Sequence, residues 1–304
     1  MRICSLLPGA TEIVHSLGLI DQIVAISDDC DYPPEVRNKP IISKSKISGK
    51  NYSSGAIHRK IDDHRHSGLS QYDLRESELQ RVNPDLILTQ ELCEVCAVPY
   101  AQVVKAAKVL GDQVKIVSLE PRTLSDVLDN IRLVGSLTGT DARSEVVVRD
   151  LAKRIEYVRS RARDVEIRPR VLSIEWTDPL IAGGHWVPEM VDIAGGIDGI
   201  LKPGDWSVRL AWSQIVDFDP EVIIVMPCSH TLDEASSELK TLKEIEGWRR
   251  LTAVRNGKVY AVEASSFFSR SGPRLVDGLE ILAEILHEDI FHGLAPDASY
   301  AKIA

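Results

Sequence analysis

Short apolar runs alternate along this chain with longer segments in which apolar residues recur every three or four positions. Runs of four or five apolar residues are typical of buried strands, and the longer spacing is typical of amphipathic helices. In the first part of the chain, the pattern predicts strands over 2–6, 22–26, 85–89 and 114–118 and helices over 10–18, 76–82 and 99–110. A polar stretch over 43–75 interrupts this order and is expected to hold a short helix near 54–62.

The second part of the chain repeats the order of the first. Residues 83–96 and 219–230 each combine a helix end broken by Pro, a short apolar run and a polar turn with Cys or His. The pattern predicts strands over 170–174, 221–225 and 258–262 and helices over 187–194, 211–217, within 233–246 and over 273–287. Helices 10–18 and 187–194 each carry an acid, which is Glu12 in the first of the two. We expect this acid in the first turn, where the helix dipole favours negative charge.

A long helical stretch over 123–165 connects the two parts and is interrupted only at 138–140. Helix 141–163 would be about 34 Å long at about 1.5 Å per residue, enough to span both lobes. We therefore predict an α/β fold of two Rossmann-like lobes with central parallel sheets, joined by one long connecting helix. The expected divisions are 1–120, 121–165 and 166–304, and a rigid connector predicts little lobe closure.

Composition narrows the class of protein. The 304 residues are 44% hydrophobic and 27% charged, which is typical of a globular protein with two domains. A net charge of −9 argues against a nucleic-acid partner, and no apolar run reaches the roughly 20 residues that membrane insertion needs. We expect a monomer. The chain opens directly on a strand and has five cysteines, so we expect a cytoplasmic location, or an extracytoplasmic one if a leader was removed.

Ligands of open parallel sheets bind beyond the carboxyl ends of the strands. The loops predicted there carry the candidate residues Pro8, Gly9, Gln90, Cys93, Cys96, His185, Trp186, Cys228, His230, Phe268 and Arg270. Cys93 and Cys96 fit three interpretations: ordinary loop cysteines, a ligand or metal contact, or a redox pair.

His185 follows Gly184 at the predicted start of a helix, which disfavours the protonated imidazole. A neutral ring can ligate a metal, so His185 is a candidate cobalt ligand; the alternative is a histidine that caps the helix or packs under Trp186. The histidines at 58, 64 and 66 lie among acids in the polar stretch and are expected to be solvated surface.

Tryptophans gather in the second part of the chain, whereas the first part has none. Trp186, Trp206 and Trp212 lie near the predicted cleft, and rigid aromatic area suits a large, planar, partly apolar ligand. Phe268 and Arg270 add apolar area and a cation that could meet a polar edge of the ligand. The sequence carries no Walker loop, nucleophile elbow, HExxH or three-glycine fingerprint, so we predict a binding protein and not an enzyme.

These residues resemble a known family, the class III substrate-binding proteins of ABC importers, which have a helical backbone and bind cobalamin, siderophores or haem. The resemblance rests on SLLPGATE at 5–12, DYPP at 31–34, the connecting helix, LAWSQI at 210–215 and RSGPR at 270–274. Segments 88–98 and 182–189 are similar to a leaderless subgroup described as cobalamin-binding.

The resemblance implies a corrinoid ligand, cobalamin or a precursor, with no further cofactor required. It implies ligand contacts at Asp29, Tyr32, Gln90, Trp212 and Arg270. Gln90 stands where the importer protein has an aromatic residue, and Ser266 stands where it has the acid that pairs with the arginine.

The resemblance also implies an ABC permease as partner. The family's docking glutamates correspond here to Ser77 and Phe218, with acids only adjacent, so a cytoplasmic carrier stands as the alternative to a component that docks to a permease. The alternative ligands are haem, a siderophore or another metal chelate. The alternative from another class is a thiol-dependent enzyme that uses Cys93 and Cys96 on a bound corrinoid or metal.

Overall fold

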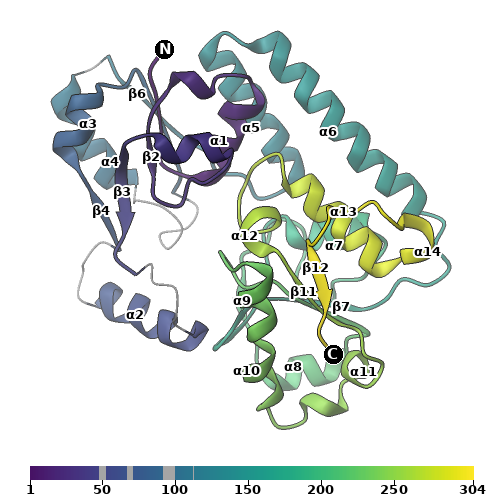
Figure 1. The fold of residues 1–304 in the computed structure, drawn as a ribbon. Coiled ribbons are helices and arrows are strands. Elements are labelled where there is room, and N and C mark those ends of the chain that lie inside the picture. Colours follow the sequence, from purple (N-terminus) through teal and green to yellow (C-terminus); the bar gives the residue numbers. More distant parts are fainter. Residues whose placement is uncertain (48–52, 67–70, 92–99, 112) are drawn as a thin grey trace.

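The computed structural model describes residues 1–47, 53–66, 71–91, 100–111 and 113–304. Two α/β lobes, each built on a six-stranded sheet, are connected by a pair of long helices (Figure 1). The predicted two-lobed α/β fold is confirmed.

The first lobe has the sheet order β4-β3-β2-β1-β5-β6. Its strands are β1 (Ile3–Ser5), β2 (Ile23–Ser27), β3 (Ile41–Ser45), β4 (Tyr72–Leu74), β5 (Leu86–Thr89) and β6 (Lys115–Ser118). Only the edge pairing of β3 with β4 is antiparallel among the described strands of this sheet. β1 and β5 at its centre are buried on both faces, which explains their continuous apolar runs.

Four α-helices belong to this lobe: α1 (Pro8–Ser16), α2 (Ser54–His66), α3 (Glu76–Val82) and α4 (Tyr100–Ala107). Short 3₁₀ turns cover Ile20–Gln22, Pro34–Asn38 and Lys108–Leu110. α2 confirms the short helix predicted in the polar stretch, although that stretch also contains β4 and the end of β3. α1 begins two residues earlier than predicted, so Glu12 lies beyond the first turn and the dipole interpretation of it is wrong.

The second lobe has the sheet order β12-β11-β10-β7-β8-β9. Its strands are β7 (Val171–Thr177), β8 (Leu180–Ala182), β9 (Val208–Arg209), β10 (Val222–Val225), β11 (Val259–Val262) and β12 (Tyr300–Lys302). The central strands β7, β10 and β11 are parallel as predicted. The outer strands β8, β9 and β12 are antiparallel, because hairpins and the returning C-terminus supply them.

The helices of this lobe are mostly short. They are α7 (Val187–Ile193), α8 (Trp212–Phe218), α9 (Leu232–Ser237), α10 (Leu239–Lys243), α11 (Thr252–Arg255), α12 (Ala264–Phe267), α13 (Leu275–Leu286) and α14 (Glu288–Phe291), with a 3₁₀ turn at Trp248–Arg250. The closing helix α13 begins two residues after Pro273, where the sequence had predicted its start.

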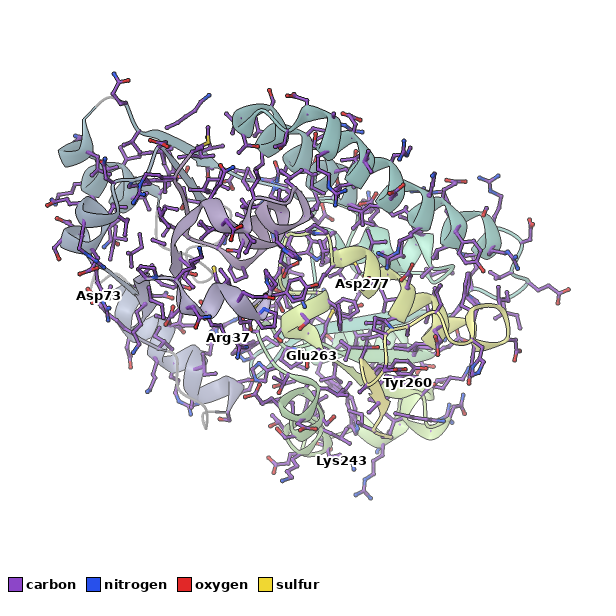
Figure 2. All side chains as sticks on the ribbon, turned by 45° about the horizontal axis from the view of Figure 1, so that its top comes forward. Arg37, Asp73, Lys243, Tyr260, Glu263 and Asp277 are labelled. Carbon is purple, nitrogen blue, oxygen red and sulfur yellow. The ribbon has the colours of Figure 1, made fainter. Side chains whose placement is uncertain are left out.

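The connector consists of α5 (Leu124–Thr138) and α6 (Asp141–Ala162), which are separated at the interruption predicted at 138–140, and α6 is the predicted long connecting helix. Gly139, in a left-handed conformation at φ +70°, ends α5 and lets the chain turn back. α6 contacts both lobes: Arg143 donates to the Ser16 carbonyl at 3.2 Å, and Arg154 donates to Glu280 at 2.8 Å. Asp277, labelled in Figure 2, lies on α13 and also accepts from Arg154.

A single apolar core runs through both lobes and the connector. It joins Ile13 of α1, Ile131 of α5, Val158 of α6 and Leu279 of α13, all of which are fully buried. Smaller clusters lie under the outer faces of the two sheets. Because the lobes share this core, a large change of their relative angle would expose apolar surface, and this favours a cleft of nearly fixed width.

Candidate functional site

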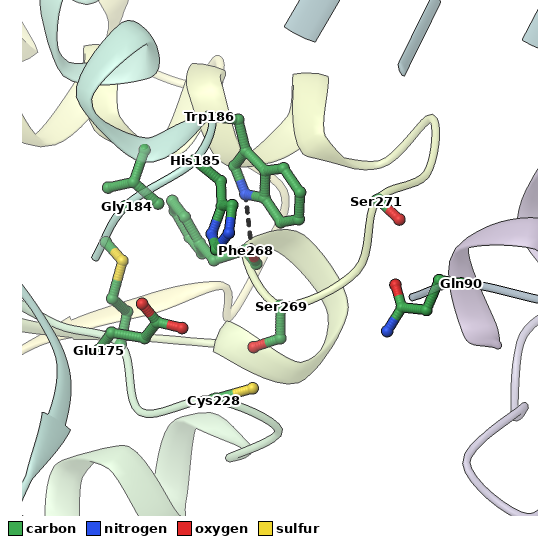
Figure 3. A pocket seen from close by; sticks show the side chains of 11 residues that line it. Gln90, Glu175, Gly184, His185, Trp186, Cys228, Phe268, Ser269 and Ser271 are labelled. Atoms are coloured by element: carbon green, nitrogen blue, oxygen red, sulfur yellow. Dashed lines mark hydrogen bonds between the residues drawn. The ribbon is translucent and has the colours of Figure 1, made fainter. Parts of the chain in front are cut away.

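A pocket that is open to solvent lies between the lobes at the carboxyl ends of the central strands. Its lining residues are Gln90, Glu175, Gly184, His185, Trp186, Val187, Met226, Cys228, Phe268, Ser269 and Ser271 (Figure 3). Among the described residues, Gln90 after β5 is the contribution of the first lobe, and the second lobe supplies the rest. This position is typical of small-molecule sites in α/β folds.

The glycine-rich turn after β8 fixes the position of His185. A Cβ on Gly184 would lie 2.4 Å from the Ser207 nitrogen, so glycine is required where the two segments touch. The His185 N–H donates to the Asp205 carbonyl at 2.6 Å, and the His185 carbonyl accepts from Gly204 at 2.9 Å. These bonds hold His185 at φ +55°, which a non-glycine residue adopts only when its surroundings impose it.

The His185 imidazole is half-buried between two indole rings. Its centroid lies 5.7 Å from that of Trp186 and 5.1 Å from that of Trp206. Nε2 is buried and has no hydrogen-bond partner among the described residues. Burial lowers the pKa of His185, and the Arg122 guanidinium lowers it further. The sequence analysis predicted a neutral ring because of the nearby helix N-terminus, whereas in the structure burial and Arg122 disfavour the protonated form.

Trp186 and Phe268 form the apolar wall of the pocket. Both are buried, and the Trp186 Nε1–H donates to the Phe268 carbonyl at 2.9 Å. Trp206 does not line the pocket: it is 47% exposed and packs behind His185, with the Arg122 guanidinium 4.6 Å above its ring.

Glu175, on β7, is a pocket residue that sequence reasoning missed. Its carboxylate accepts a hydrogen bond from the Ser207 hydroxyl and points into the pocket (Figure 3). Burial raises the pKa of Glu175, while the Ser207 hydroxyl and the Gly184 N–H oppose the shift. The available signal was an acid near the end of an otherwise apolar strand.

Arg270 lies outside the pocket lining and spans the two lobes. Its guanidinium donates to Asp31 of the first lobe and lies 3.8 Å from Glu12. Beside it, Arg274 donates to Glu12 at 2.6 Å. The sequence comparison assigned the partner position to Ser266, whereas the acids that pair with Arg270 come from the opposite lobe.

The other candidates from the first lobe also lie at this contact. The Arg274 guanidinium lies 4.0 Å above the Tyr32 ring, while Asp29 is exposed. Pro8 opens α1, and the backbone of Gly9 approaches Ser271 so closely that a Cβ would lie 2.7 Å from the Ser271 oxygen.

Two aromatic candidates of the second lobe are not in the pocket. Trp212 lines a separate pocket on this lobe, with Gly247 and Leu251 among its neighbours, so its predicted place in the cleft is wrong. His230 is buried behind the pocket, where Nδ1 donates to the Cys228 carbonyl at 3.0 Å and the ring meets Trp176 edge-on. Cys228 itself is a lining residue.

The remaining predictions concern the polar stretch and the cysteine pair. Cys93 and Cys96 lie outside the described residues. His58 is not solvated surface as predicted: its Nε2 lies 2.6 Å from Arg209 of the second lobe and 3.4 Å from Asp62. The side chains of the other two histidines of this stretch lie outside the described residues.

Within the described ranges, no group of three or more His, Cys, Asp or Glu side chains is arranged to hold a metal ion. No helix in the described part of the chain has the length and apolar character to cross a membrane.

Comparison with known proteins identifies the family. Residues 3–265 match the family described as periplasmic binding protein. The chain is 25% identical over 280 residues to a vitamin B12-binding protein of Vibrio cholerae, covering 92% of this chain and 86% of that protein. It is 23% identical over 295 residues to an uncharacterised ABC transporter substrate-binding lipoprotein of Bacillus subtilis, covering 95% of this chain and 81% of the relative.

Solved structures share the fold. A periplasmic vitamin B12-binding protein of Vibrio cholerae superposes with a TM-score of 0.67 at 22% identity, covering 94% of this chain and 96% of its own. A periplasmic heme-binding protein of Pseudomonas aeruginosa superposes with a TM-score of 0.72 at 18% identity, covering 95% of this chain and 93% of its own. The fold is thus shared by binders of both kinds of macrocycle.

Proposed function

Since this chain belongs to the periplasmic binding protein family, we propose that its inter-lobe pocket binds a corrinoid, either cobalamin or one of its precursors. The relatives named as vitamin B12-binding proteins support this ligand class, because they align with nearly the whole chain. The pocket supports it as well, since it offers an apolar wall for a macrocycle and a nitrogen donor for its metal.

The observation that carries the proposal is the place of His185 on the pocket lining, with an Nε2 that has no hydrogen-bond partner among the described residues. Because this nitrogen is buried, the proposal includes a turn of the imidazole that presents Nε2 to the ligand. A neutral imidazole is a good ligand for first-row transition metals, and a buried nitrogen without a partner costs free energy until a ligand satisfies it. In this proposal His185 ligates the cobalt, Trp186 and Phe268 contact the ring, and Gln90 meets the ligand from the opposite lobe.

A haem binder is the second candidate. Haem-binding proteins share the fold, and an imidazole nitrogen ligates iron as readily as cobalt. The two candidates differ in the charge at the ligand's edge, since haem carries two propionates whereas the corrin ring of cobalamin carries neutral amides.

The proposal is tested by visible spectroscopy of the purified protein with hydroxocobalamin, dicyanocobinamide and haemin in turn, each followed by desalting. We expect retained corrinoid with a shifted band, and loss of the shift in His185→Ala. His292→Ala is the matched control, because His292 is 82% exposed at the far end of the second lobe. A protein that retains haem with a Soret shift but no corrinoid would replace the proposal by the second candidate.

We propose further that the loaded protein delivers its ligand to an ABC permease, as the name of the Bacillus subtilis relative indicates for that protein. The test is uptake of labelled cobalamin by the native host with and without this gene. Loss of uptake on deletion supports delivery to a permease. Unchanged uptake, with corrinoid still bound to the purified protein, would instead support a carrier that acts inside the cell.

A further inference from the structure

The pocket contains an acid without a matching cation. Glu175 turns its carboxylate into the space, with the Ser207 hydroxyl as its side-chain hydrogen-bond donor. Neither Lys nor Arg occurs among the described residues that line the pocket. On the side of β7, the described lining therefore offers a hydrogen-bond acceptor and no positive charge.

The arginines nearest to the pocket are already engaged. Arg270 is paired with Asp31, and Arg274 is paired with Glu12. Arg122 stacks on the ring of Trp206, which lies behind His185, and is itself exposed. An anionic group that entered beside Glu175 would therefore find no free guanidinium on the described walls.

We propose, on the basis of the function proposed above, that Glu175 determines specificity by selecting ligands whose edge carries neutral amides and rejecting those with carboxylates. An amide N–H donates to an ionised carboxylate, and an amide carbonyl accepts from a protonated one, so an amide pairs with Glu175 in either state. A ligand carboxylate meets like charge when Glu175 is ionised, and one of the two carboxyl groups must take up a proton before they can form a hydrogen bond. Specificity gains from this cost, which an amide does not incur. Glu175 thereby favours corrinoid amides over carboxylated precursors and over haem propionates.

The raised pKa of Glu175 agrees with this assignment. It indicates that the surroundings disfavour even one negative charge at this position, because burial removes water and nothing cationic replaces it. A second negative charge would be disfavoured more strongly for the same reason.

The test compares the affinity for dicyanocobinamide, whose ring edge carries amides, with that for cobyrinic acid, in which those amides are carboxylates. Titrations use the full chain and follow tryptophan fluorescence. The net charge of −9 disfavours any polyanion, so a variant that removes one unrelated charge is needed as control. Glu175→Gln is compared with Glu189→Gln, because Glu189 is also a partly buried acid of the second lobe with a raised pKa, but lies outside the pocket lining.

We expect wild-type protein to prefer cobinamide, and Glu175→Gln to lower that preference about tenfold, the effect of one like-charge contact, while Glu189→Gln leaves it unchanged within about twofold. Equal wild-type affinities for the two ligands, or haem bound as tightly as cobinamide, would overturn the inference without any variant. A preference that is identical in wild type and folded Glu175→Gln would also overturn it, yet leave the corrinoid proposal intact. Absence of binding by either corrinoid would overturn both proposals.

Discussion

The pair of Glu12 and Arg274 is expected to make a large contribution to the stability of the two-lobed arrangement. Glu12 is 2% exposed in α1 of the first lobe, and Arg274 is 16% exposed just before α13 of the second. Arg274→Met keeps much of the apolar volume but leaves the carboxylate buried without its nearest partner. Removal of one partner from a buried ion pair costs about 3–5 kcal/mol. Because Arg270 stays 3.8 Å from Glu12, we expect a loss near the lower limit, about 3 kcal/mol.

The penalty depends on pH in a defined direction. Burial raises the pKa of Glu12, and the hydrogen bond from Arg274 opposes that rise. A group with a raised pKa in the folded state stabilises that state when protonated, fully below the pKa of the unfolded chain, and this stabilisation is lost as the pH rises through the folded-state pKa. Without Arg274 the folded-state pKa of Glu12 rises further. The cost of Arg274→Met is therefore expected to be greatest near pH 7 and to shrink as the pH falls towards 5.

Urea unfolding at 25 °C, followed by tryptophan fluorescence, measures these differences. Arg132→Met is the matched control, because Arg132 pairs with acids on the exposed face of the connector and such pairs contribute at most about 1 kcal/mol. The double variant Glu12→Gln with Arg274→Met is expected to recover most of the loss, since no buried charge remains. The reasoning is refuted if Arg274→Met costs no more than Arg132→Met, or if its cost is the same at pH 5 and pH 7.

Three further changes probe the cleft. Gly184→Ala puts a Cβ 2.4 Å from the Ser207 nitrogen and is expected to displace His185. A thermal scan should show a melting temperature lower by several degrees. Unchanged melting and ligand spectra would contradict this. Gly9→Ala puts a Cβ 2.7 Å from the Ser271 oxygen and is expected to widen the cleft, so the radius of gyration by X-ray scattering should rise; no change would argue against a tight lobe contact there. Arg209→Ala removes one contact of α2 with the second lobe, the pair of Arg209 and His58, and faster amide exchange over 54–63 is expected. Equal exchange would show that this pair contributes nothing.

Local sequence patterns predicted the central strands better than the short outer ones. The buried strands β1, β5 and β10 were found because a parallel strand covered on both faces needs an unbroken apolar run. The short antiparallel strands β4, β8, β9 and β12 were missed. They are only two or three residues long, and pairing with a neighbouring strand, not their own composition, makes them strands.

The candidate site was predicted only in part, for a similar reason. Gln90, Cys228 and Phe268 were found among the pocket residues because they follow the parallel strands β5, β10 and β11, and the loops after such strands converge at one edge of a sheet. His185 and Trp186 also line the pocket, but they follow the antiparallel strand β8, which returns the chain alongside β7. Glu175 was missed because its side chain projects from within a strand, and strand register decides which side chain faces the cleft.

By itself the sequence determined the alternating α/β order, the two lobes, the helical connector and the loops that carry chemistry, since each depends on local periodicity, turn residues and chain length. Tertiary structure decided which charges meet. Arg270 and Asp31 are 239 positions apart and Glu12 and Arg274 are 262 apart, so only the packing of one lobe against the other brings them into contact. It also decided that Nε2 of His185 is buried without a hydrogen-bond partner among the described residues, because the surroundings of a buried atom come from segments far apart in the chain and have no local signature in the sequence.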